Sequence, residues 1–234
     1  MNSPAPVLSG LLVVDKPVGV SSMDVVRKVR RVAGGRKTKV GHAGTLDPLA
    51  SGVVVCCLGK ATRLVEKLMD LPKVYETRID LSAFTETDDR EGTRQEVKVA
   101  DKPDQETVRR QIRQFVGLIE QRPPPYSAVH VGGKRAYQMA RKGELIELPA
   151  RTVRIDQVML LEYEWPILAL RITCGRGTYI RSIARDLGRA LDTGGHLAAL
   201  RRTAVGPYDL STAFTWQRLD APIGADDLID SIGP

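Results

Sequence analysis

The chain has 234 residues, 42% of them hydrophobic, with only 14 Pro; this composition excludes a disordered protein and predicts one large folded domain. The longest unbroken apolar run is six residues (53–58), so no membrane span is expected. The sequence does not begin with a basic segment followed by an apolar one, so no secretion signal is expected either. The net charge is +7, and because residues 209–234 carry five Asp and one Arg, residues 1–208 hold +11. Such an excess fits a polyanionic partner, although charge alone does not separate RNA from DNA.

The first forty residues predict a strand, a helix and a basic loop. Residues 10–15 (GLLVVD) are typical of a buried strand, followed by a Pro-Gly turn. Ser21 with Asp24 three residues later indicates a capping box at the start of a helix. That helix has an apolar stripe and, together with the loop at 34–39, seven cations within residues 27–39. A solvated face is the plain alternative to a binding surface there. The stripe consists of Val25, Val26, Val29, Val32 and Ala33.

Residues 41–52 (GHAGTLDPLASG) follow neither the helical nor the strand period. They lead into an apolar strand at 53–58 and then a helix near 60–70. A Gly-bearing loop beside a core strand is a favourable place for chemistry. Residues 74–81 alternate and predict a half-buried strand, with Tyr75, Thr77, Ile79 and Leu81 on one side.

The middle of the chain predicts further elements without catalytic character. Residues 85–92 (TETDDREG) indicate an acidic turn, and 96–99 a short strand. Asp104 can cap a helix whose inward residues are Val108, Ile112, Phe115 and Val116.

The second half begins with a change in composition. Residues 121–151 contain PPPYSA, a GG turn and a short basic helix predicted at 134–142, which suggests an insertion outside the core. Residues 153–163 and 167–174 predict strands, and 178–191 a helix buried through its apolar face. Because strands and helices do not alternate strictly, the fold class expected is α+β with a mixed, mainly antiparallel central sheet. The acidic tail, 211–234, shows no strong pattern beyond a short helix.

Several kinds of site are excluded by spacing. Gly59-Lys60 is no phosphate-binding loop, because Val54 stands at the first Gly position and Ala61 at the hydroxyl position. The pair Gly175 and Gly177 lacks the third Gly of a dinucleotide fingerprint. The His and Cys residues show no zinc-ligand spacing, no GxSxG occurs, and no CxxC pair is present. These patterns support neither a nucleotide cofactor nor a zinc site, and the three cysteines predict reduced thiols in a cytoplasmic protein.

Asp47, between Leu46 and Pro48, is the candidate catalytic carboxylate. An Asp before Pro is more often a turn former. Held among apolar neighbours, however, it needs a cation to stay ionised, and Arg176 and Arg181 are the candidates. Arg181, near a helix N-terminus, is expected to have an anionic partner unless it is a plain surface Arg. Tyr75 is either core packing or a platform on which a base stacks.

Five ordered motifs resemble the TruB family of tRNA pseudouridine synthases over residues 10–210. They are LLVVDKPVGVSS, KVGHAGTLDPLASGVVVCCLGKATR, KVYETRIDLSAFTETDDREG, PPPYSAVHVGGKRAYQMARKG and CGRGTYIRSIARDLG. The resemblance implies isomerisation of uridine to pseudouridine in the T loop of tRNA, at position 55 in tRNA numbering, without a cofactor. It also implies a pseudouridine-synthase catalytic domain over residues 8–210 and a T-arm contact by the insertion at about 121–151.

The resemblance assigns site residues by motif. Asp47 of GTLDP is implied to be the essential carboxylate, Tyr75 of KxY to stack on the uracil and help remove its C5 proton, and Arg181 of GTYIR to pair with Asp47. The implied substrate-binding residues are Lys16, His42, Tyr179, Lys134, Arg135 and Arg141.

The chain departs from many family members in one respect. It ends in a short acidic tail where they carry a PUA-type domain, so we expect no separate PUA domain. We also expect the protein to be a monomer. Two other hypotheses are an RNA chaperone, disfavoured by the intact set of Asp47, Tyr75 and Arg181, and the catalytic subunit of a guide-RNA particle. The second is disfavoured by the missing C-terminal domain and basic extensions.

Overall fold

The structure is a computed structural model, and it describes residues 8–127, 130–131, 134–135, 139 and 148–230. The chain divides into two compact units. Unit 1 comprises the described parts of Met1–Tyr75 and Arg201–Pro234, and unit 2 comprises those of Glu76–Leu200. Two strands, β4 (Lys73–Asp80) and β12 (His196–Val205), run through both units.

Unit 1 is built around β3 (Ser51–Leu58), whose residues are buried from Gly52 onward. Strand β1 (Gly10–Lys16) runs antiparallel to it, with Leu12 opposite Cys56, and β12 runs parallel to it at Ser51 and Gly52. A strand covered on both faces needs a continuous apolar run, and VVVCCL supplies one. The remaining strands of unit 1 are β2 (Val40–His42), antiparallel to β3, and β13 (Tyr208–Asp209), antiparallel to β12.

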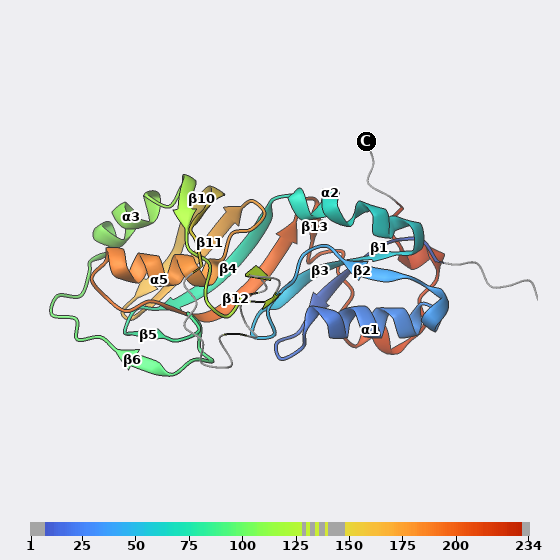
Figure 1. The fold of residues 1–234 in the computed structure, drawn as a ribbon, viewed down its shortest axis with the longest axis horizontal. Coiled ribbons are helices and arrows are strands. Elements are labelled where there is room, and N and C mark those ends of the chain that lie inside the picture. The colour runs from blue at the N-terminus through green and yellow to red at the C-terminus, as the bar shows by residue number, and fades with distance from the viewer. Residues whose placement is uncertain (1–7, 128–129, 132–133, 136–138, 140–147, 231–234) are drawn as a thin grey trace, which may run out of the picture. The chain divides into compact units, whose positions relative to one another are not determined.

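Helix α1 (Ser22–Val32) packs on β1, β2 and β3 (Figure 1). The predicted capping box is confirmed, because the Ser21 hydroxyl accepts from the Asp24 N–H while the Asp24 carboxylate accepts from the Ser21 N–H. The helix predicted near 60–70 is a 3-10 helix, η2 (Gly59–Leu64), before it becomes α2 (Val65–Asp70).

The C-terminal segment of unit 1 has more structure than its sequence indicates. It forms backbone bridges to β1, with Phe214 beside Val14 and Ile229 beside Leu11. Leu219, in the 3-10 helix η3 (Arg218–Asp220), is fully buried. The buried or bridging residues Phe214, Leu219 and Ile229 are spaced along a polar segment without a helical or strand period. The sequence pattern therefore predicts little of the structure of this segment. The other short helices of unit 1 are η1 (Gly35–Lys37) and η4 (Ala225–Asp227).

Unit 2 holds strands in the order β4-β11-β10-β7, in which β10 is antiparallel to both β11 and β7. The predicted strands at 153–163 and 167–174 are confirmed as β10 (Arg151–Glu164) and β11 (Ile167–Cys174). Helix α3 (Gln105–Arg113) packs on β10 and on α5 (Ile180–Ala190). The other strands of unit 2 are β5 (Ala83–Thr85), β6 (Arg94–Glu96), β7 (Gly117–Gln121), β8 (His130–Val131) and β9 (Lys134–Arg135).

Some predicted elements are wrong in detail. The strand expected at 96–99 lies at Arg94–Glu96, where it forms a hairpin with β5. Asp104 caps α3 as predicted, but Val116 lies beyond the helix and is 45% exposed. The helix predicted from Lys134 is a strand at its first two residues, and most of its remainder lies outside the described residues. The fold class, α+β with a mainly antiparallel sheet, is confirmed. None of the helices in the described ranges is long and apolar enough to cross a membrane.

Candidate active site

The Asp47 loop joins β2 to β3 in unit 1. Leu46 and Leu49 are buried on either side of Asp47, which is itself half-buried. A tight turn closes where the Ala50 N–H donates to the Asp47 carbonyl at 3.1 Å. The turn therefore forms through the backbone of Asp47, and its carboxylate sits at a fixed point between two apolar anchors.

The N-terminus of α1 fixes the same loop. Ser22, 3% exposed, donates its hydroxyl to the Leu46 carbonyl at 3.0 Å and accepts from the Leu46 N–H at 2.8 Å. The Gly19 N–H donates to the Pro48 carbonyl at 2.7 Å. Because the capping box defines where α1 begins, it also defines where Ser22 meets the loop. Both backbone neighbours of Asp47 are thus held by the segment that follows β1.

Lys16 is a fully buried cation beneath the Asp47 loop. Its ammonium donates to the carbonyls of Pro17, Val20 and Ala50 at 2.9, 2.6 and 2.5 Å. These bonds use all three of its protons and connect the Pro-Gly turn to the end of the loop. Burial lowers the pKa of Lys16 to about 8, with the charge of Arg202 acting in the same direction and the charges of Asp47 and Asp24 against it.

Lys16 gives the protein a pH-dependent stability. Its pKa of about 8 lies below the ordinary value of 10.5, so between these values the unfolded chain binds the proton more tightly than the folded one. The contribution of Lys16 to the free energy of unfolding therefore rises from pH 8 toward pH 10.5 and is lost as the pH falls. We expect the stability gap between wild type and Lys16→Met to be wider at pH 9.5 than at pH 7.5, as measured by urea unfolding.

The control is Lys98→Met, which alters an exposed lysine and should leave its own gap unchanged with pH. A Lys16→Met gap that is constant over the same range would contradict the lowered pKa.

Arg202, on β12, is the main residue of the site that sequence reasoning missed. It is 1% exposed, and its guanidinium donates to the carbonyls of Gly44, Thr45 and Val53 at 3.2, 3.3 and 2.7 Å. These carbonyls lie on both sides of Asp47 in the chain, so one side chain holds the two arms of the loop. In the sequence alone, an Arg suggests an ordinary solvated residue. No strand is predicted over residues 196–205 either, so nothing in the sequence indicates that Arg202 is buried.

Gly52 allows this arrangement. Its φ is +107°, and a Cβ placed there would lie 2.1 Å from the Arg202 carbonyl oxygen. Only Gly lets β12 approach the end of the Asp47 loop so closely. The last Gly of GHAGTLDPLASG is therefore required by strand packing.

Two further predicted residues lie in unit 1. His42 ends β2 and is half-buried. Burial, and then the charge of Arg202, lower its pKa, and its buried Nδ1 has no hydrogen-bond partner of normal geometry in the described part of the chain. Tyr75 is half-buried on β4, where Thr77 and Ile79 alternate inward as predicted. A neutral imidazole and an aromatic ring that is partly accessible both suit contact with a base.

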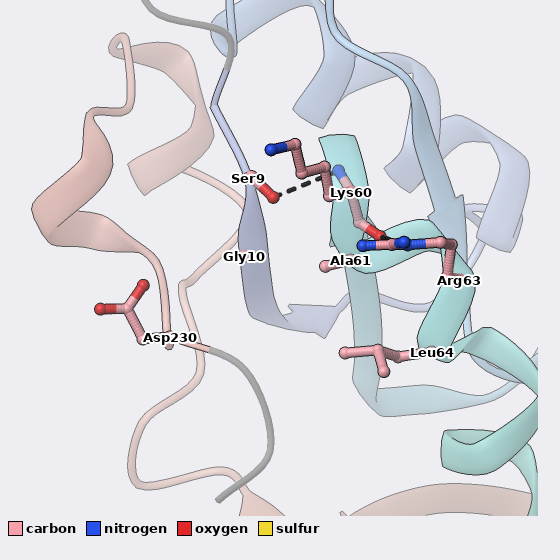
Figure 2. A pocket seen from close by; sticks show the side chains of 7 residues that line it. All are labelled: Ser9, Gly10, Lys60, Ala61, Arg63, Leu64 and Asp230. Atoms are coloured by element: carbon pink, nitrogen blue, oxygen red, sulfur yellow. Dashed lines mark hydrogen bonds between the residues drawn. The ribbon is translucent and has the colours of Figure 1, made fainter.

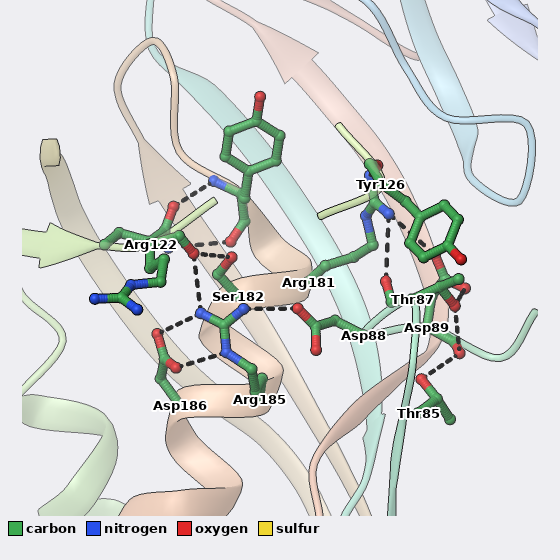
Figure 3. A network of polar contacts seen from close by, with 12 residues as sticks. Thr85, Thr87, Asp88, Asp89, Arg122, Tyr126, Arg181, Ser182, Arg185 and Asp186 are labelled. Atoms are coloured by element: carbon green, nitrogen blue, oxygen red, sulfur yellow. Dashed lines mark hydrogen bonds and ion pairs between the residues drawn. The ribbon is translucent and has the colours of Figure 1, made fainter. Parts of the chain in front are cut away.

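Arg181 and its neighbours form a buried polar network in unit 2 (Figure 3). Arg181, in the first turn of α5, has Nη1 at 3.4 Å from the Asp89 carboxylate and at 3.3 Å from the Thr87 carbonyl. Its Nη2 donates to the Tyr126 carbonyl at 3.0 Å. The prediction that Arg181 has an anionic partner is therefore confirmed, and that partner is Asp89, which is 2% exposed. Asp47 belongs to the other unit, and its pairing with Arg181 stays a prediction.

The acidic turn at 85–92, whose sequence has no catalytic character, has a structural role. Arg185 donates to Asp88 at 2.7 Å and Arg181 contacts Asp89, so two aspartates of the turn hold two arginines of α5. Arg185 also donates to Asp186 of the same helix at 2.9 Å. Burial raises the pKa of the Asp88 carboxyl, while Arg185 acts against that shift. The sequence contains one indication of this network. Arg181 and Arg185 are four residues apart, which places both on one helix face, where they need acidic partners.

Tyr179 is positioned through its backbone. The amide side chain of Gln121 accepts from the Tyr179 N–H at 2.7 Å and donates to the Tyr179 carbonyl at 3.1 Å. Gln121 is 1% exposed, and Pro123 and Pro124 are buried. The beginning of the predicted insertion is therefore part of the core of unit 2, contrary to expectation. Lys134 and Arg135 lie on β9, paired with β8, whereas Arg141 lies outside the described residues.

The fold is that of a pseudouridylate synthase. A sequence model described as the N-terminal domain of TruB family pseudouridylate synthase matches residues 30–180, and one described as the tRNA pseudouridylate synthase B C-terminal domain matches residues 181–231. The chain belongs to the TruB family.

Similar proteins agree with this membership. A Thermobifida fusca protein named tRNA pseudouridine synthase B is 47% identical over 95% of this chain and 78% of its own length. A Corynebacterium glutamicum protein of the same name is 45% identical over 94% and 74%. Among solved structures, a Cbf5-Nop10-Gar1 complex matches with a TM-score of 0.70 at 31% identity, covering 90% of this chain and 54% of the other. An H/ACA RNP bound to a substrate RNA containing 2'-deoxyuridine matches with a TM-score of 0.67 at 28% identity.

Proposed function

We propose that this protein isomerises uridine to pseudouridine in tRNA, at the T stem-loop. The similarity to proteins named tRNA pseudouridine synthase B supports the reaction and the substrate class. The observation that carries the proposal is the fixed Asp47 loop, in which Lys16, Ser22 and Arg202 hold the backbone on both sides of one carboxylate. Such preorganisation is what a reacting group needs to act at a sugar carbon.

The chemistry requires an exchange of bonds within one nucleotide. The bond from C1′ to N1 breaks, the uracil turns while it is held, a bond from C1′ to C5 forms, the C5 proton leaves and N1 gains a proton. The base must first leave the stack of the folded loop. Tyr75 replaces the lost stacking and assists removal of the C5 proton, and Asp47 acts at C1′, at C6 or on the C2′ proton. Each route needs an ionised carboxylate.

The remaining predicted residues have supporting roles in this proposal. Arg181 pairs with Asp47 and orients its carboxylate, and Tyr179 and His42 border the base. Lys134, Arg135 and Arg141 contact phosphates of the T arm. The protein works as a monomer in the cytoplasm and uses no metal or organic cofactor; its three cysteines are buried.

The test is to map pseudouridine in unmodified tRNA after incubation with the purified protein alone. We expect complete conversion of one uridine in the T loop without guide RNA or protein partners. Because similar solved structures come from complexes of Cbf5 and H/ACA RNPs, dependence on an added guide RNA is the informative alternative. Conversion at another tRNA position, or none, would reject the proposed target.

A further inference from the structure

Arg185 is a buried arginine of α5 to which the proposed reaction gives no role. It is 8% exposed, and its Nη1 donates to the Asp88 carboxylate at 2.7 Å while its Nη2 donates to the Arg122 carbonyl at 2.9 Å. Its Nε donates to Asp186 of the same helix at 2.9 Å. Figure 3 shows this guanidinium between the helix, the acidic turn and the chain at Arg122. Each of its three nitrogens has an acceptor, so the position of the guanidinium is fixed.

Arg63, on the surface of unit 1, shows how an ordinary arginine differs from Arg185. It lines an open hollow of about 550 Å³ together with Lys60 and Asp230 (Figure 2). Arg63 is exposed, and its Nε donates to the Lys60 carbonyl, three residues earlier, at 3.3 Å. A bond of that kind lies within one helical turn and holds no other segment. Arg185 instead joins its helix to acceptors 97 and 63 residues earlier in the chain, so it sets where those segments lie.

The two segments that Arg185 holds are also the two that hold Arg181. The acidic turn presents the Asp89 carboxylate at 3.4 Å from Nη1 of Arg181, and the segment 122–126 presents the Tyr126 carbonyl at 3.0 Å from Nη2. Arg185 lies one helical turn further along α5 and bonds the residue before Asp89 and the residue at the start of the segment 122–126. One arginine therefore anchors both sets of acceptors of the other.

Asp88 has a backbone conformation that few residues other than Gly adopt. Its φ is +59°, in the left-handed region, where Asp is tolerated better than most side chains. Its N–H donates to the Thr85 carbonyl at 3.2 Å, and its carbonyl accepts from the Leu197 N–H at 3.0 Å. Such a conformation persists where the surroundings impose it, and the bond from Arg185 to its carboxylate is part of those surroundings. The conformation of Asp88 sets the direction in which the chain presents Asp89.

The buried charges make this arrangement sensitive to the loss of Arg185. Asp88 and Asp89 are adjacent in the chain and are 6% and 2% exposed. Two adjacent buried carboxylates stay ionised together only when cations accompany them, and Arg185 and Arg181 each accompany one. Without Arg185, Asp88 would be a buried charge that has lost its ion pair. The turn would then shift toward solvent and carry Asp89 away from Arg181.

We propose that Arg185, together with Asp88, is a positioning residue for the isomerisation, because it fixes the two segments that place the guanidinium of Arg181. The inference rests on the proposed function, which gives Arg181 its role at Asp47. In this scheme Arg185 acts only through Arg181. Its loss therefore lowers the rate of the chemical step and leaves the affinity for tRNA unchanged.

The experiment compares Arg185→Met with Arg189→Met, a matched control on the next turn of α5. The side chain of Arg189 is 67% exposed, and its Nη1 lies 3.8 Å from the Asp186 carboxylate, so the control also removes one positive charge beside Asp186. Single-turnover conversion of an unmodified tRNA transcript and its dissociation constant are measured at a temperature at which circular dichroism shows each variant folded. We expect Arg185→Met to lower the rate at saturating enzyme by about 10- to 100-fold, the scale on which a misplaced catalytic group acts, with the dissociation constant within about two-fold of wild type. Arg189→Met should match the wild type in both.

Two variants of Asp88 supply the same test if Arg185→Met does not fold. Asp88→Asn retains the volume, the tolerance of a left-handed backbone and an oxygen that accepts from Arg185, whereas Asp88→Ala loses all three. We expect Asp88→Asn to keep at least about a third of the wild-type rate and Asp88→Ala to be slower by about 10-fold or more. A purely structural contact would lower the midpoint of thermal unfolding of Asp88→Ala without changing the rate of the folded protein.

The outcomes separate this inference from the proposed function. Arg185→Met and Asp88→Ala combined should slow the reaction no more than the slower single variant, because both break one contact. Folded Arg185→Met and Asp88→Ala proteins that convert tRNA at the wild-type rate would overturn the inference and leave the proposed function intact, as would a loss of rate that Arg189→Met shares. A wild-type protein that converts no uridine would reject the proposed function and, with it, the role of Arg181 on which this inference rests.

Discussion

Asp47→Asn is expected to lower pseudouridine formation in tRNA by at least about 1,000-fold, which is the scale on which loss of a reacting carboxylate acts. The change is nearly isosteric, but an amide can neither carry the negative charge nor act as a nucleophile or base at the sugar. Single-turnover conversion with excess enzyme is the measurement, because it reports the chemical step rather than product release.

The same variant is expected to fold and bind tRNA normally. The loop is held through main-chain groups of its other residues, by Lys16 at Ala50, Ser22 at Leu46 and Arg202 at Thr45. Each of these contacts survives the substitution. The midpoint of thermal unfolding and the tRNA dissociation constant should therefore stay near wild type.

Asp101→Asn, at an exposed position, provides the control for loss of one negative charge and should convert tRNA at the wild-type rate. Turnover that persists in Asp47→Asn would remove Asp47 from the reaction and leave it as the turn former that its place before Pro48 suggests.

Parts of the fold could be predicted because local patterns coincide with tertiary packing. Ser21 and Asp24 define the start of α1 through contacts three residues apart, and β10 follows the alternation of a half-buried sheet. The apolar run in β3 indicates a strand covered on both faces. For α1, β3 and β10 the residues that determine the structure are neighbours in the sequence.

The missed features depend on partners distant in sequence. β12 contains Arg201 and Arg202 side by side, and a buried guanidinium breaks the apolar alternation that reveals a strand. Its acceptors lie about 150 positions earlier, as the bond to Val53 illustrates. Likewise, Asp88 and Asp89 resemble a solvated turn until α5 brings Arg185 and Arg181 against them. The burial of such a charge can be predicted only when its partner is known, and the two members of each ion pair lie more than 90 residues apart in the sequence.

Arg202→Met is expected to lower the free energy of unfolding by about 3 kcal/mol, because the carbonyls of Gly44, Thr45 and Val53 lose a charged donor in a buried place. Met fills a similar volume, so the loss reports the hydrogen bonds rather than a cavity. The matched control is Arg201→Met. The side chain of Arg201 is 39% exposed and pairs with Asp15, and a partly exposed pair of that kind contributes about 0 to 1 kcal/mol. Urea unfolding of the two variants at one pH gives the comparison.

Arg202→Lys separates the role of the charge from that of the fork geometry. A lysine keeps the positive charge near the loop but cannot reach Gly44, Thr45 and Val53 at once, because its three donors share one nitrogen. If Arg202 acts by holding both arms of the loop around Asp47, single-turnover conversion at 25 °C should fall at least about 10-fold in Arg202→Lys, with the tRNA dissociation constant unchanged. A fully active lysine variant would assign the role of Arg202 to its charge alone, and equal stability of Arg202→Met and Arg201→Met would reject the buried clamp.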